Sequence, residues 1–278
     1  MISIYRGARD YIIEAEETQY QTSEFSLNEL FRAEDPENWL RERLATIPKA
    51  QQLLDLPAQT WLPPVESQEI WAAGVTYFRS REARMEEAEV AGGDVFYDKV
   101  YDADRPELFM KATAARARGH RAQIRVRADS TWDVPEPELT LAINAGGKIF
   151  GYTIGNDVSS RSIEGENPLY LPQAKVYRGS CAVGPALIVG RDAVSPDSTI
   201  KLTIERGGEV GFEGETQVSQ IKRGLDELAE YLFLENEFPD GAMLMTGTGV
   251  VPDDFTLKSG DVVKISISGL GVLENPVE

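Results

Sequence analysis

The sequence predicts a mixed α+β fold in which short β-strands predominate, and three observations support this class. Residues 1–25 and most of the chain after residue 93 are short apolar runs separated by Gly, Pro and Asp, a pattern typical of strands and turns. Helical signals are confined to a few segments. A proline-rich connector, LPAQTWLPPVE at 56–66, divides the chain, so we expect a small N-terminal α+β domain at 1–66 and a larger, mostly β domain at 67–278.

Each helical segment has a recognisable start or stop signal. Ser26 begins SLNEL and Glu29 follows three residues later, which is the spacing of a capping box. Asp35 caps a second helix whose first position is Pro36. A charged helix is expected in SREARMEEAEVAGG, residues 80–93, where two glycines would end it. The last helix is expected within 224–238, and its apolar stripe indicates core packing: Leu225, Leu228, Ala229 and Leu232.

Residues 134–157, VPEPELTLAINAGGKIFGYTIGND, predict a β-hairpin that turns at AGGK, 145–148. If the turn centres between Gly146 and Gly147, the numbers of opposed residues sum to 293. A one-residue slip would scramble the apolar face that this register creates, which supports the register. The pairs on that face are Leu139 with Ile154, Leu141 with Tyr152, and Ile143 with Phe150.

The same register gathers three acids on the opposite face of the hairpin. Asp157 lies across from Glu136, about 5 Å away by the usual cross-strand spacing, and Glu138 is two residues further along. Like charges this close repel unless a cation or shared protons relieve them. Carboxylate oxygens alone suit a hard divalent ion such as Mg²⁺, with Mn²⁺ or Ca²⁺ possible. A solvated strand face is the alternative.

Small residues on that face predict open space above the acids. Gly151, Thr153 and Gly155 are expected to leave room there for a ligand rather than for a bulky core.

Composition excludes several classes of partner. With 28 Lys and Arg against 46 Asp and Glu, the net charge of −18 argues against nucleic-acid binding, which needs clustered cations. A single cysteine, Cys181, cannot form an internal disulfide and fits a reducing compartment. We find neither an apolar leader at the N-terminus nor a run of about 18 apolar residues. A cytoplasmic protein without a membrane partner is therefore expected.

Ordered sequence blocks carry a family resemblance. EPELTLAI at 136–143 followed by GYTIGNDVSSR at 151–161 resembles the metal-binding signature of the fumarylacetoacetate hydrolase superfamily, a Glu-x-Glu followed by an Asp. The further blocks, in the expected order, are GVTY at 74–77, PELFMK at 106–111, QAKVYRGSCAVGP at 173–185, MTGTGVV at 245–251 and LKSGDVVKISISGLG at 257–271.

The resemblance, which covers roughly 71–271, implies a fold and a metal site. The expected catalytic domain is a β-roll of irregular strands, in proteins that are usually homodimers or higher homo-oligomers. Glu136, Glu138 and Asp157 match the positions that hold the divalent metal, and the substrate is expected to be a small 2-oxo acid. Lys175 matches the superfamily's active-site lysine, which would act with the two glutamates in catalysis.

Three further residues are expected to bind substrate. Gly247 and Thr248 lie in TGTG, where backbone amides and a hydroxyl could cradle a carboxylate. Arg161 resembles the superfamily arginine that follows the metal-binding aspartate, although Ser162 replaces the acid common beside it. A structural salt bridge is the alternative role for Arg161.

The most informative departure from the superfamily lies upstream. Carbon–carbon hydrolases of this superfamily commonly carry a histidine that activates water, and here GVTYFRSREAR places Ser80 at that position. The single histidine, His120, follows a glycine in a segment expected to be a surface loop or turn. A site without that base is poorly suited to hydrolysis, but it could still support loss of water from a sugar acid.

The segment around Ser80 and two later blocks resemble the branch of the superfamily that contains 2-keto-3-deoxy-D-arabinonate dehydratase. The blocks concerned are SREAR, DVPEPEL at 133–139 and EGENPLYLPQAK. In that branch a 2-keto-3-deoxy pentonate gives 2,5-dioxopentanoate plus water, so Ser80 and Arg81 are expected to contact substrate, with Arg79 and Arg84 as further candidates. A charged helix with Arg–Glu pairs is the alternative for these arginines.

We therefore expect a metal-dependent dehydratase of a 2-keto-3-deoxy sugar acid. A hydrolase of acylpyruvates or 2,4-diketo sugar acids is the first alternative, with water activated by another carboxylate such as Glu166 or by the metal. A non-catalytic metal-binding protein is the second.

Overall fold

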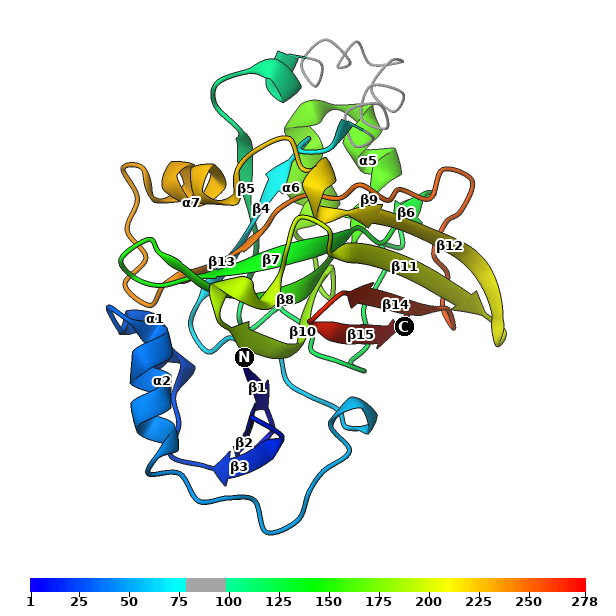
Figure 1. The fold of residues 1–278 in the computed structure, drawn as a ribbon. Helices are drawn as coiled ribbons and strands as arrows, with labels where there is room; N and C mark the ends of the chain where they lie inside the picture. The colour runs from blue at the N-terminus through cyan, green and yellow to red at the C-terminus, as the bar shows by residue number, and fades with distance from the viewer. Residues whose placement is uncertain (79–98) are drawn as a thin grey trace.

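The computed structural model describes residues 1–78 and 99–278, and strands dominate this part of the chain (Figure 1). The largest sheet has nine strands in the order β3-β2-β1-β10-β8-β7-β13-β4-β5. Every neighbouring pair in it is antiparallel except β13 with β4. The mostly β class predicted from the sequence is confirmed.

The strands of the nine-stranded sheet are β1 (Ile2–Arg6), β2 (Tyr11–Ala15), β3 (Thr18–Thr22), β4 (Glu69–Gly74), β5 (Glu107–Thr113), β7 (Pro137–Ile143), β8 (Ile149–Asp157), β10 (Cys181–Val189) and β13 (Ala242–Met245). A second sheet, in the order β12-β11-β14-β15, comprises β11 (Thr199–Arg206), β12 (Glu209–Gln217), β14 (Val262–Ile267) and β15 (Gly271–Pro276). A short ribbon pairs β6 (Asp133–Val134) with β9 (Ser159–Ser160).

The described helices are short and lie between strands. The α-helices are α1 (Leu27–Arg32), α2 (Pro36–Leu44), α5 (Arg161–Glu166), α6 (Leu171–Lys175) and α7 (Leu225–Phe233), and the 3₁₀ turns are η1 (Leu56–Ala58), η3 (Pro168–Tyr170), η4 (Arg191–Ala193) and η5 (Val218–Gln220). None of the helices in residues 1–78 and 99–278 is long and apolar enough to cross a membrane.

Two apolar cores lie on the two faces of the large sheet. One core joins β7 and β8 to the second sheet and to α7, whose Leu228, Ala229 and Leu232 are buried as predicted. The other core joins the sheet to α1 and α2, and it includes Leu30 and Phe31. In Figure 1 the second sheet (yellow to red) and the N-terminal helices (blue) accordingly lie on different sides of the large sheet.

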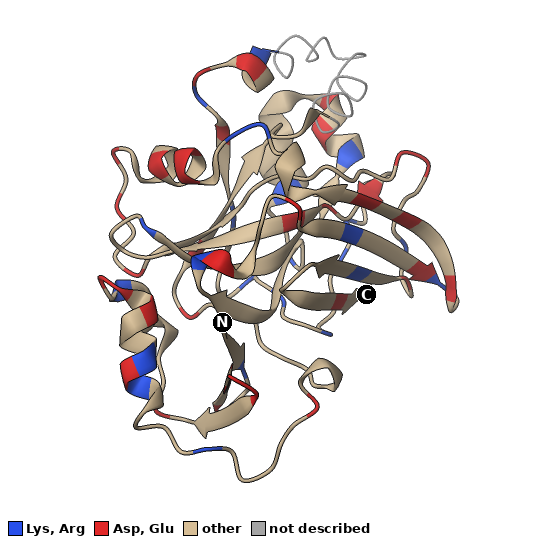
Figure 2. Ribbon diagram, in the orientation of Figure 1, with Lys and Arg blue, Asp and Glu red and all other residues tan. Residues whose placement is uncertain are grey.

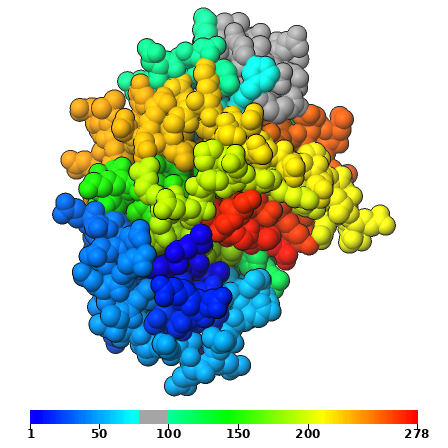
Figure 3. Space-filling view, in the orientation of Figure 1, coloured from blue at the N-terminus to red at the C-terminus, as the bar shows by residue number. Residues whose placement is uncertain are grey.

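The N-terminal segment is joined to the rest of the molecule through the sheet. β1 pairs with β10, so β1, β2 and β3 extend the nine-stranded sheet rather than forming a separate one. In the space-filling view the N-terminal residues gather at one end and pack directly on the remainder (Figure 3). The division of the chain at residue 66 stays a prediction.

The predicted helix caps are present. Ser26 accepts a hydrogen bond from the Glu29 amide at 3.4 Å, and Asp35 accepts one from the Asn38 amide at 3.1 Å. The acid that binds the Ser26 hydroxyl is Glu66, from the connector, at 2.8 Å. The first helix is therefore tied at its start to the segment that the sequence marks as a boundary.

The hairpin of β7 and β8 departs from the predicted register near its turn. Leu139 opposes Ile154 and Leu141 opposes Tyr152, as expected, but a bulge next to Ala142 pairs Ile143 with Ile149. The predicted pairing of Ile143 with Phe150 is therefore wrong. The extra residue sends the Phe150 side chain to the other face of the sheet, where its ring meets that of Phe31 at 4.9 Å between centroids.

Charged residues are spread over the elements of the described chain. Figure 2 shows Asp and Glu on helices, strands and loops across the whole view, with Lys and Arg scattered among them. The acidic residues of the described chain are therefore not confined to one element.

Candidate metal centre

Three buried carboxylates meet where β7 begins and β8 ends. Glu136, Glu138 and Asp157 are 4%, 1% and 1% exposed, and each offers one oxygen within 4.8 Å of the others. The register holds at this end of the hairpin, since the Asp157 amide donates to the Glu136 carbonyl at 3.0 Å. Side chains two residues apart on one strand share a face, so the sequence places these three acids together.

The electrostatics of the cluster favour a bound cation. Burial raises the pKa of Glu138 well above its usual value, and the charges of Asp157 and Glu136 add to this effect, against Lys175 and the Gly247 amide, which act the other way. Buried like charges need a counter-ion. Among the described residues, the group that could hold a metal ion consists of carboxylates alone, a donor set suited to a hard divalent ion. The residues therefore fit a magnesium-type site.

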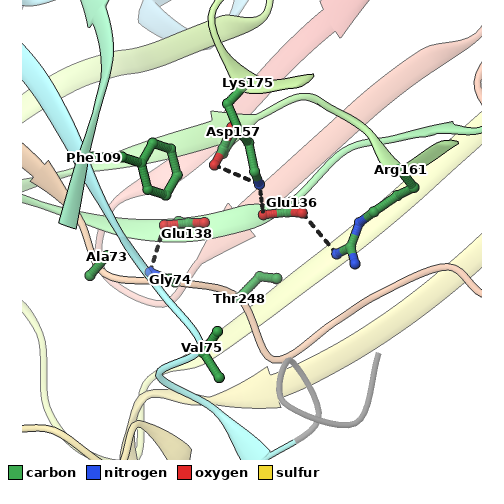
Figure 4. Close-up of a pocket in the computed structure, with 11 residues that line it drawn as sticks. Ala73, Gly74, Val75, Phe109, Glu136, Glu138, Asp157, Arg161, Lys175 and Thr248 are labelled. Carbon is green, nitrogen blue, oxygen red and sulfur yellow. Dashed lines mark hydrogen bonds and ion pairs between the residues drawn. The ribbon is translucent and has the colours of Figure 1, made fainter. Parts of the chain in front are cut away.

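Lys175 is the last residue of α6 and points into the carboxylate cluster (Figure 4). Its Nζ donates to Glu136 Oε2 at 2.8 Å, to Asp157 Oδ2 at 3.0 Å and to Ser159 Oγ at 2.6 Å. The Phe109 ring lies 5.6 Å from Nζ and covers it from the side of β5. The structure thus places the predicted active-site lysine against two of the three predicted ligands.

Arg161 begins α5 and contacts the cluster from the other side. Its Nη2 donates to Glu136 Oε1 at 2.8 Å, and its Nε lies 3.9 Å from Glu164 Oε2. The guanidinium lines the pocket although the side chain is only 1% exposed. Ser162, which replaces the superfamily's acid, hydrogen-bonds Ser130 instead, at 2.9 Å. The structural ion pair weighed for Arg161 is present.

The TGTG turn holds a ligand of the cluster itself. The Gly247 amide donates to Glu138 Oε2 at 2.6 Å, so the prediction that this amide cradles a substrate carboxylate has to be corrected. Gly247 has a φ of +90°, and a Cβ there would lie 2.0 Å from Thr76 Oγ1. Thr248 lines the pocket, and its hydroxyl donates to the Val250 carbonyl at 3.0 Å.

The expected open space above the hairpin is filled by the protein. A Cβ on Gly151 would lie 2.4 Å from the Ile188 carbonyl oxygen of β10, and one on Gly155 would lie 2.4 Å from Thr140 Oγ1. Thr153 is fully buried and donates to the Ala186 carbonyl. These small residues allow close packing of β8 against its neighbours, so the prediction of a ligand space above them is wrong.

Several predicted residues lie elsewhere. Ser80 and Arg81, together with the helix expected at 80–93, fall outside the described residues. Glu166, considered as an alternative base, is exposed at the end of α5 and does not line the pocket. His120 lies in a loop as expected but is buried, where burial lowers its pKa and its ring accepts a bond from the Glu274 amide at 3.1 Å. The expectation of a surface histidine is therefore wrong.

Two residues of the PELFMK block reach the site without having been predicted to do so. Glu107 lies across from Gly74, and its carboxylate fills the space where a side chain at Gly74 would be, because a Cβ there would meet Oε2 at 1.9 Å. Lys111 is fully buried and forms an ion pair with Asp157 Oδ1. The signal in the sequence is a lysine inside the apolar strand ELFMKAT, where a charge requires a buried partner.

The free space at the centre is small. About 10 Å³ remains among the lining side chains, which corresponds to roughly one water-sized sphere. The lining residues are Ala73, Gly74, Val75, Phe109, Glu136, Glu138, Asp157, Arg161, Lys175, Gly247 and Thr248 (Figure 4). This volume suits an ion.

Comparison with known proteins places this centre in a family context. Residues 70–278 match the family described as Fumarylacetoacetate (FAA) hydrolase C-terminal. A probable 2-keto-3-deoxyxylonate dehydratase of Haloferax volcanii is 51% identical over 216 residues, covering 77% of this chain and 73% of the relative. A 2-dehydro-3-deoxy-D-arabinonate dehydratase of Saccharolobus solfataricus is 47% identical over 219 residues, with the same two coverages.

Solved structures agree over the whole chain. A 2-keto-3-deoxy-D-arabinonate dehydratase complexed with magnesium and 2,5-dioxopentanoate superposes with a TM-score of 0.84 at 36% identity, covering 100% of this chain and 98% of that one. A hexagonal crystal form of 2-keto-3-deoxyarabinonate dehydratase gives a TM-score of 0.86 at 37% identity with the same coverage. By both sequence and structure, this chain belongs to the fumarylacetoacetate hydrolase family.

Proposed function

We propose that this protein is a Mg²⁺-dependent dehydratase that converts a 2-keto-3-deoxy pentonate into 2,5-dioxopentanoate and water. The observation that carries the proposal is the buried Glu136–Glu138–Asp157 cluster with Lys175 bonded to two of its members. Two relatives at 51% and 47% identity are named as dehydratases of such acids, and a structure at 36% identity holds magnesium with 2,5-dioxopentanoate.

Buried cations already offset part of the charge of the cluster. The three carboxylates and Glu164 lie among the buried side chains of Lys111, Arg161 and Lys175. A divalent ion adds positive charge, which suits an anionic 2-oxo acid as the substrate.

The reaction needs a proton to leave C3 of the substrate before the C4 hydroxyl departs. Mg²⁺, when bound, supplies positive charge that polarises the 2-oxo group and makes the C3 hydrogens acidic. We assign the proton transfer to Lys175 Nζ, which Ser159 Oγ orients at 2.6 Å. A C3 hydrogen and the C4 hydroxyl leave as water, which creates a C3–C4 double bond. Transfer of a hydrogen from C5 to C3 moves the double bond to C4–C5 as an enol, and transfer of the enol hydroxyl proton to C4 gives the terminal aldehyde.

Substrate contacts are assigned to residues around the cluster. Arg161 lines the pocket and its guanidinium bonds Glu136, and Thr248 lines the same pocket. Ser80 and Arg81 keep their predicted role as contacts to the hydroxyl groups or carboxylate of the sugar acid. Gly247 is assigned instead to holding Glu138.

The test is an incubation of purified protein with 2-keto-3-deoxypentonate, with Mg²⁺ or with EDTA. We expect 2,5-dioxopentanoate to form only when Mg²⁺ is present, measured by mass spectrometry. A parallel incubation with acylpyruvates and 2,4-diketo sugar acids examines the hydrolase alternative. Release of pyruvate there, without semialdehyde in the first incubation, would make the protein a carbon–carbon hydrolase. Metal binding with no turnover of any of these acids would leave a non-catalytic metal-binding protein.

We also propose that copies of this chain associate in a reducing, cytoplasmic compartment. A depression of about 460 Å³ is lined by Arg116, Arg118 and Arg178, an unusual basic surface on a chain with a net charge of −18. An acidic face of a second copy complements it electrostatically. The compartment is supported by Cys181, a single buried thiol that burial keeps protonated by raising its pKa to about 12.

The association can be measured by light scattering after size-exclusion chromatography. We expect a dimer or larger assembly that Arg116→Glu with Arg118→Glu shifts toward monomer, while Arg9→Glu, an exposed arginine elsewhere, leaves the mass unchanged. An assembly unaffected by the double substitution would assign the contact to another surface.

A further inference from the structure

Lys111 reaches the metal centre because the sheet is irregular at this residue. On β5, Ala112 opposes Ile70 and Met110 opposes Trp71, so Lys111 is the extra residue at a register shift between β4 and β5. Such bulges change the direction of a side chain and are common beside active sites. The bulge turns a lysine of an edge strand inward, and the residue is fully buried.

The ammonium group of Lys111 is held by partners within the protein. It forms an ion pair with Asp157 Oδ1 and donates hydrogen bonds to the carbonyl oxygens of Val158 at 3.0 Å and Lys175 at 2.5 Å. Lys111 does not line the pocket, in contrast to Lys175. We therefore assign Lys111 no direct contact with a substrate.

The three partners belong to the two elements that build the site. Asp157 and Val158 lie at the end of β8, and Lys175 ends α6. Asp157 is shared between two lysines, with Lys111 on Oδ1 and Lys175 on Oδ2. Three strands separate β5 from β8 in the order of the sheet, so this contact closes the site across the sheet rather than along one hairpin.

We infer that Lys111 is a positioning residue that fixes a metal ligand, Asp157, and the backbone of Lys175 together. The part that concerns Lys175 rests on the proposed dehydratase function, whereas the part that concerns Asp157 needs only the metal site. Ser180 Oγ is a second support of the same kind, because it donates to the Lys175 carbonyl at 2.9 Å. Ser180 supports Lys175 without contacting the carboxylates through any bond described here.

Lys111→Met tests the inference because it removes the ammonium and keeps an apolar stem of similar length. Metal-free protein is titrated with Mg²⁺ in a calorimeter without substrate. The Mg²⁺ affinity of the variant should be about 10-fold weaker than that of the wild type, since residues that contact metal ligands typically contribute 10- to 100-fold to metal affinity. A lysine that merely repels the metal predicts the opposite sign, so unchanged or tighter binding overturns the inference. Lys148→Met, at an exposed lysine of the hairpin turn, is the matched control.

The kinetic arm separates positioning from a purely structural role. With 2-keto-3-deoxypentonate and saturating Mg²⁺, Lys111→Met should lower kcat by about 10- to 100-fold with KM changed much less. Ser180→Ala should lower kcat and leave the Mg²⁺ affinity unchanged, because the bonds described for its hydroxyl reach the backbone of Lys175 and Tyr177 and none of the carboxylates. Lys111→Met could instead melt at a lower temperature than the wild type and yet keep the wild-type kcat and Mg²⁺ affinity when both are measured below that temperature. That result would show that Lys111 contributes only to stability.

Two further results keep the test decisive. If Lys111→Met does not fold, Lys111→Arg is measured in its place. This substitution keeps the charge but replaces the compact ammonium with a planar guanidinium. A wild-type Mg²⁺ affinity in Lys111→Arg would overturn the inference. If the wild-type protein binds Mg²⁺ but turns over none of the sugar acids, the dehydratase proposal fails. The effect of Lys111→Met on Mg²⁺ affinity still tests the role of Lys111, because that measurement does not depend on dehydratase activity.

Discussion

At the scale of single residues, the metal centre is organised by shared use of carboxylate oxygens. Glu136 gives one oxygen to Lys175 and the other to Arg161, while Asp157 is divided between Lys175 and Lys111. Glu138 differs, since the bond described for it is to the Gly247 amide, at 2.6 Å. It is the member whose burial is compensated least within the protein, so its charge should depend most on the bound metal.

Glu138→Gln is expected to weaken Mg²⁺ binding and turnover together by at least about 100-fold, because even partners of metal ligands contribute 10- to 100-fold. Calorimetric titration and steady-state kinetics measure the two effects. Because the neutral amide fits the same buried space, the fold should persist by circular dichroism. Normal turnover at limiting Mg²⁺ would exclude Glu138 as a ligand.

Lys175→Met is expected to separate binding from chemistry. Removing the ammonium takes away a competitor for Glu136 and Asp157, so Mg²⁺ should bind at least as tightly as to the wild type. Loss of a general acid–base group should lower kcat by about 10²- to 10⁴-fold. The variant's affinity and kcat are compared with those of Lys148→Met, and a wild-type kcat would remove Lys175 from the reaction.

The residues of the centre differ in how far the sequence reveals them. Strand alternation and one hairpin register bring Glu136, Glu138 and Asp157 together, so local pattern is sufficient for these three. Lys111 lies on β5 and Gly247 follows β13, and the contacts of these two segments with the hairpin depend on the order of the sheet. A lysine within the apolar strand ELFMKAT indicates a buried partner, but nothing local in the sequence locates the bulge beside it or identifies that partner as Asp157.

At the scale of elements, secondary structure is predicted more accurately where it depends only on residues close together in the sequence. The caps at Ser26 and Asp35 are local and were predicted correctly. The bulge beside Ala142 could not be predicted, because it depends on Phe150 finding a place beside Phe31 across the sheet. For the same reason the glycines of β8 suggested an open face, although backbone of β10 occupies that space.

Glu66 joins the first helix to the connector and gives a pH-dependent contribution to stability. Burial alone would raise the pKa of Glu66, but bonds from Tyr11, the Asn28 amide and Ser26 outweigh it and bring the pKa below its usual value. A carboxylate with a lowered pKa stabilises the folded state above its unfolded pKa of about 4.3, and this contribution is lost as pH falls through the folded value.

Glu66→Gln is therefore expected to lower the free energy of unfolding at pH 7 by about 1.5–3 kcal/mol, the range for hydrogen bonds to a charged group. The difference from wild type should shrink below about pH 4, where the wild-type carboxyl is also protonated. Urea unfolding of metal-free protein at several pH values measures it, with Glu24→Gln as an exposed control. Parallel pH profiles for wild type and Glu66→Gln would contradict the assignment.

At the scale of the whole molecule, the net charge of −18 opposes compactness. Acidic residues lie on helices, strands and loops throughout the described chain (Figure 2), so their mutual repulsion is not confined to one contact that a single ion pair could relieve. Unfolding separates these charges and lowers the repulsion. Salt screens exposed charges over about 10 Å at 0.1 M and about 3 Å at 1 M, so it should favour the folded state.

We expect the free energy of unfolding, measured in EDTA to exclude metal binding, to rise between 0.05 and 1 M KCl, and each 1 kcal/mol should raise Tm by roughly 2–4 °C. Salt also strengthens apolar burial, so the charge effect needs its own control. Glu230→Lys with Glu237→Lys, at two exposed sites, changes the net charge by four units, from −18 to −14. Because less repulsion then remains to be screened, the variant should be more stable at low salt and respond less steeply to KCl. A slope equal to that of the wild type would assign the salt effect to apolar burial instead.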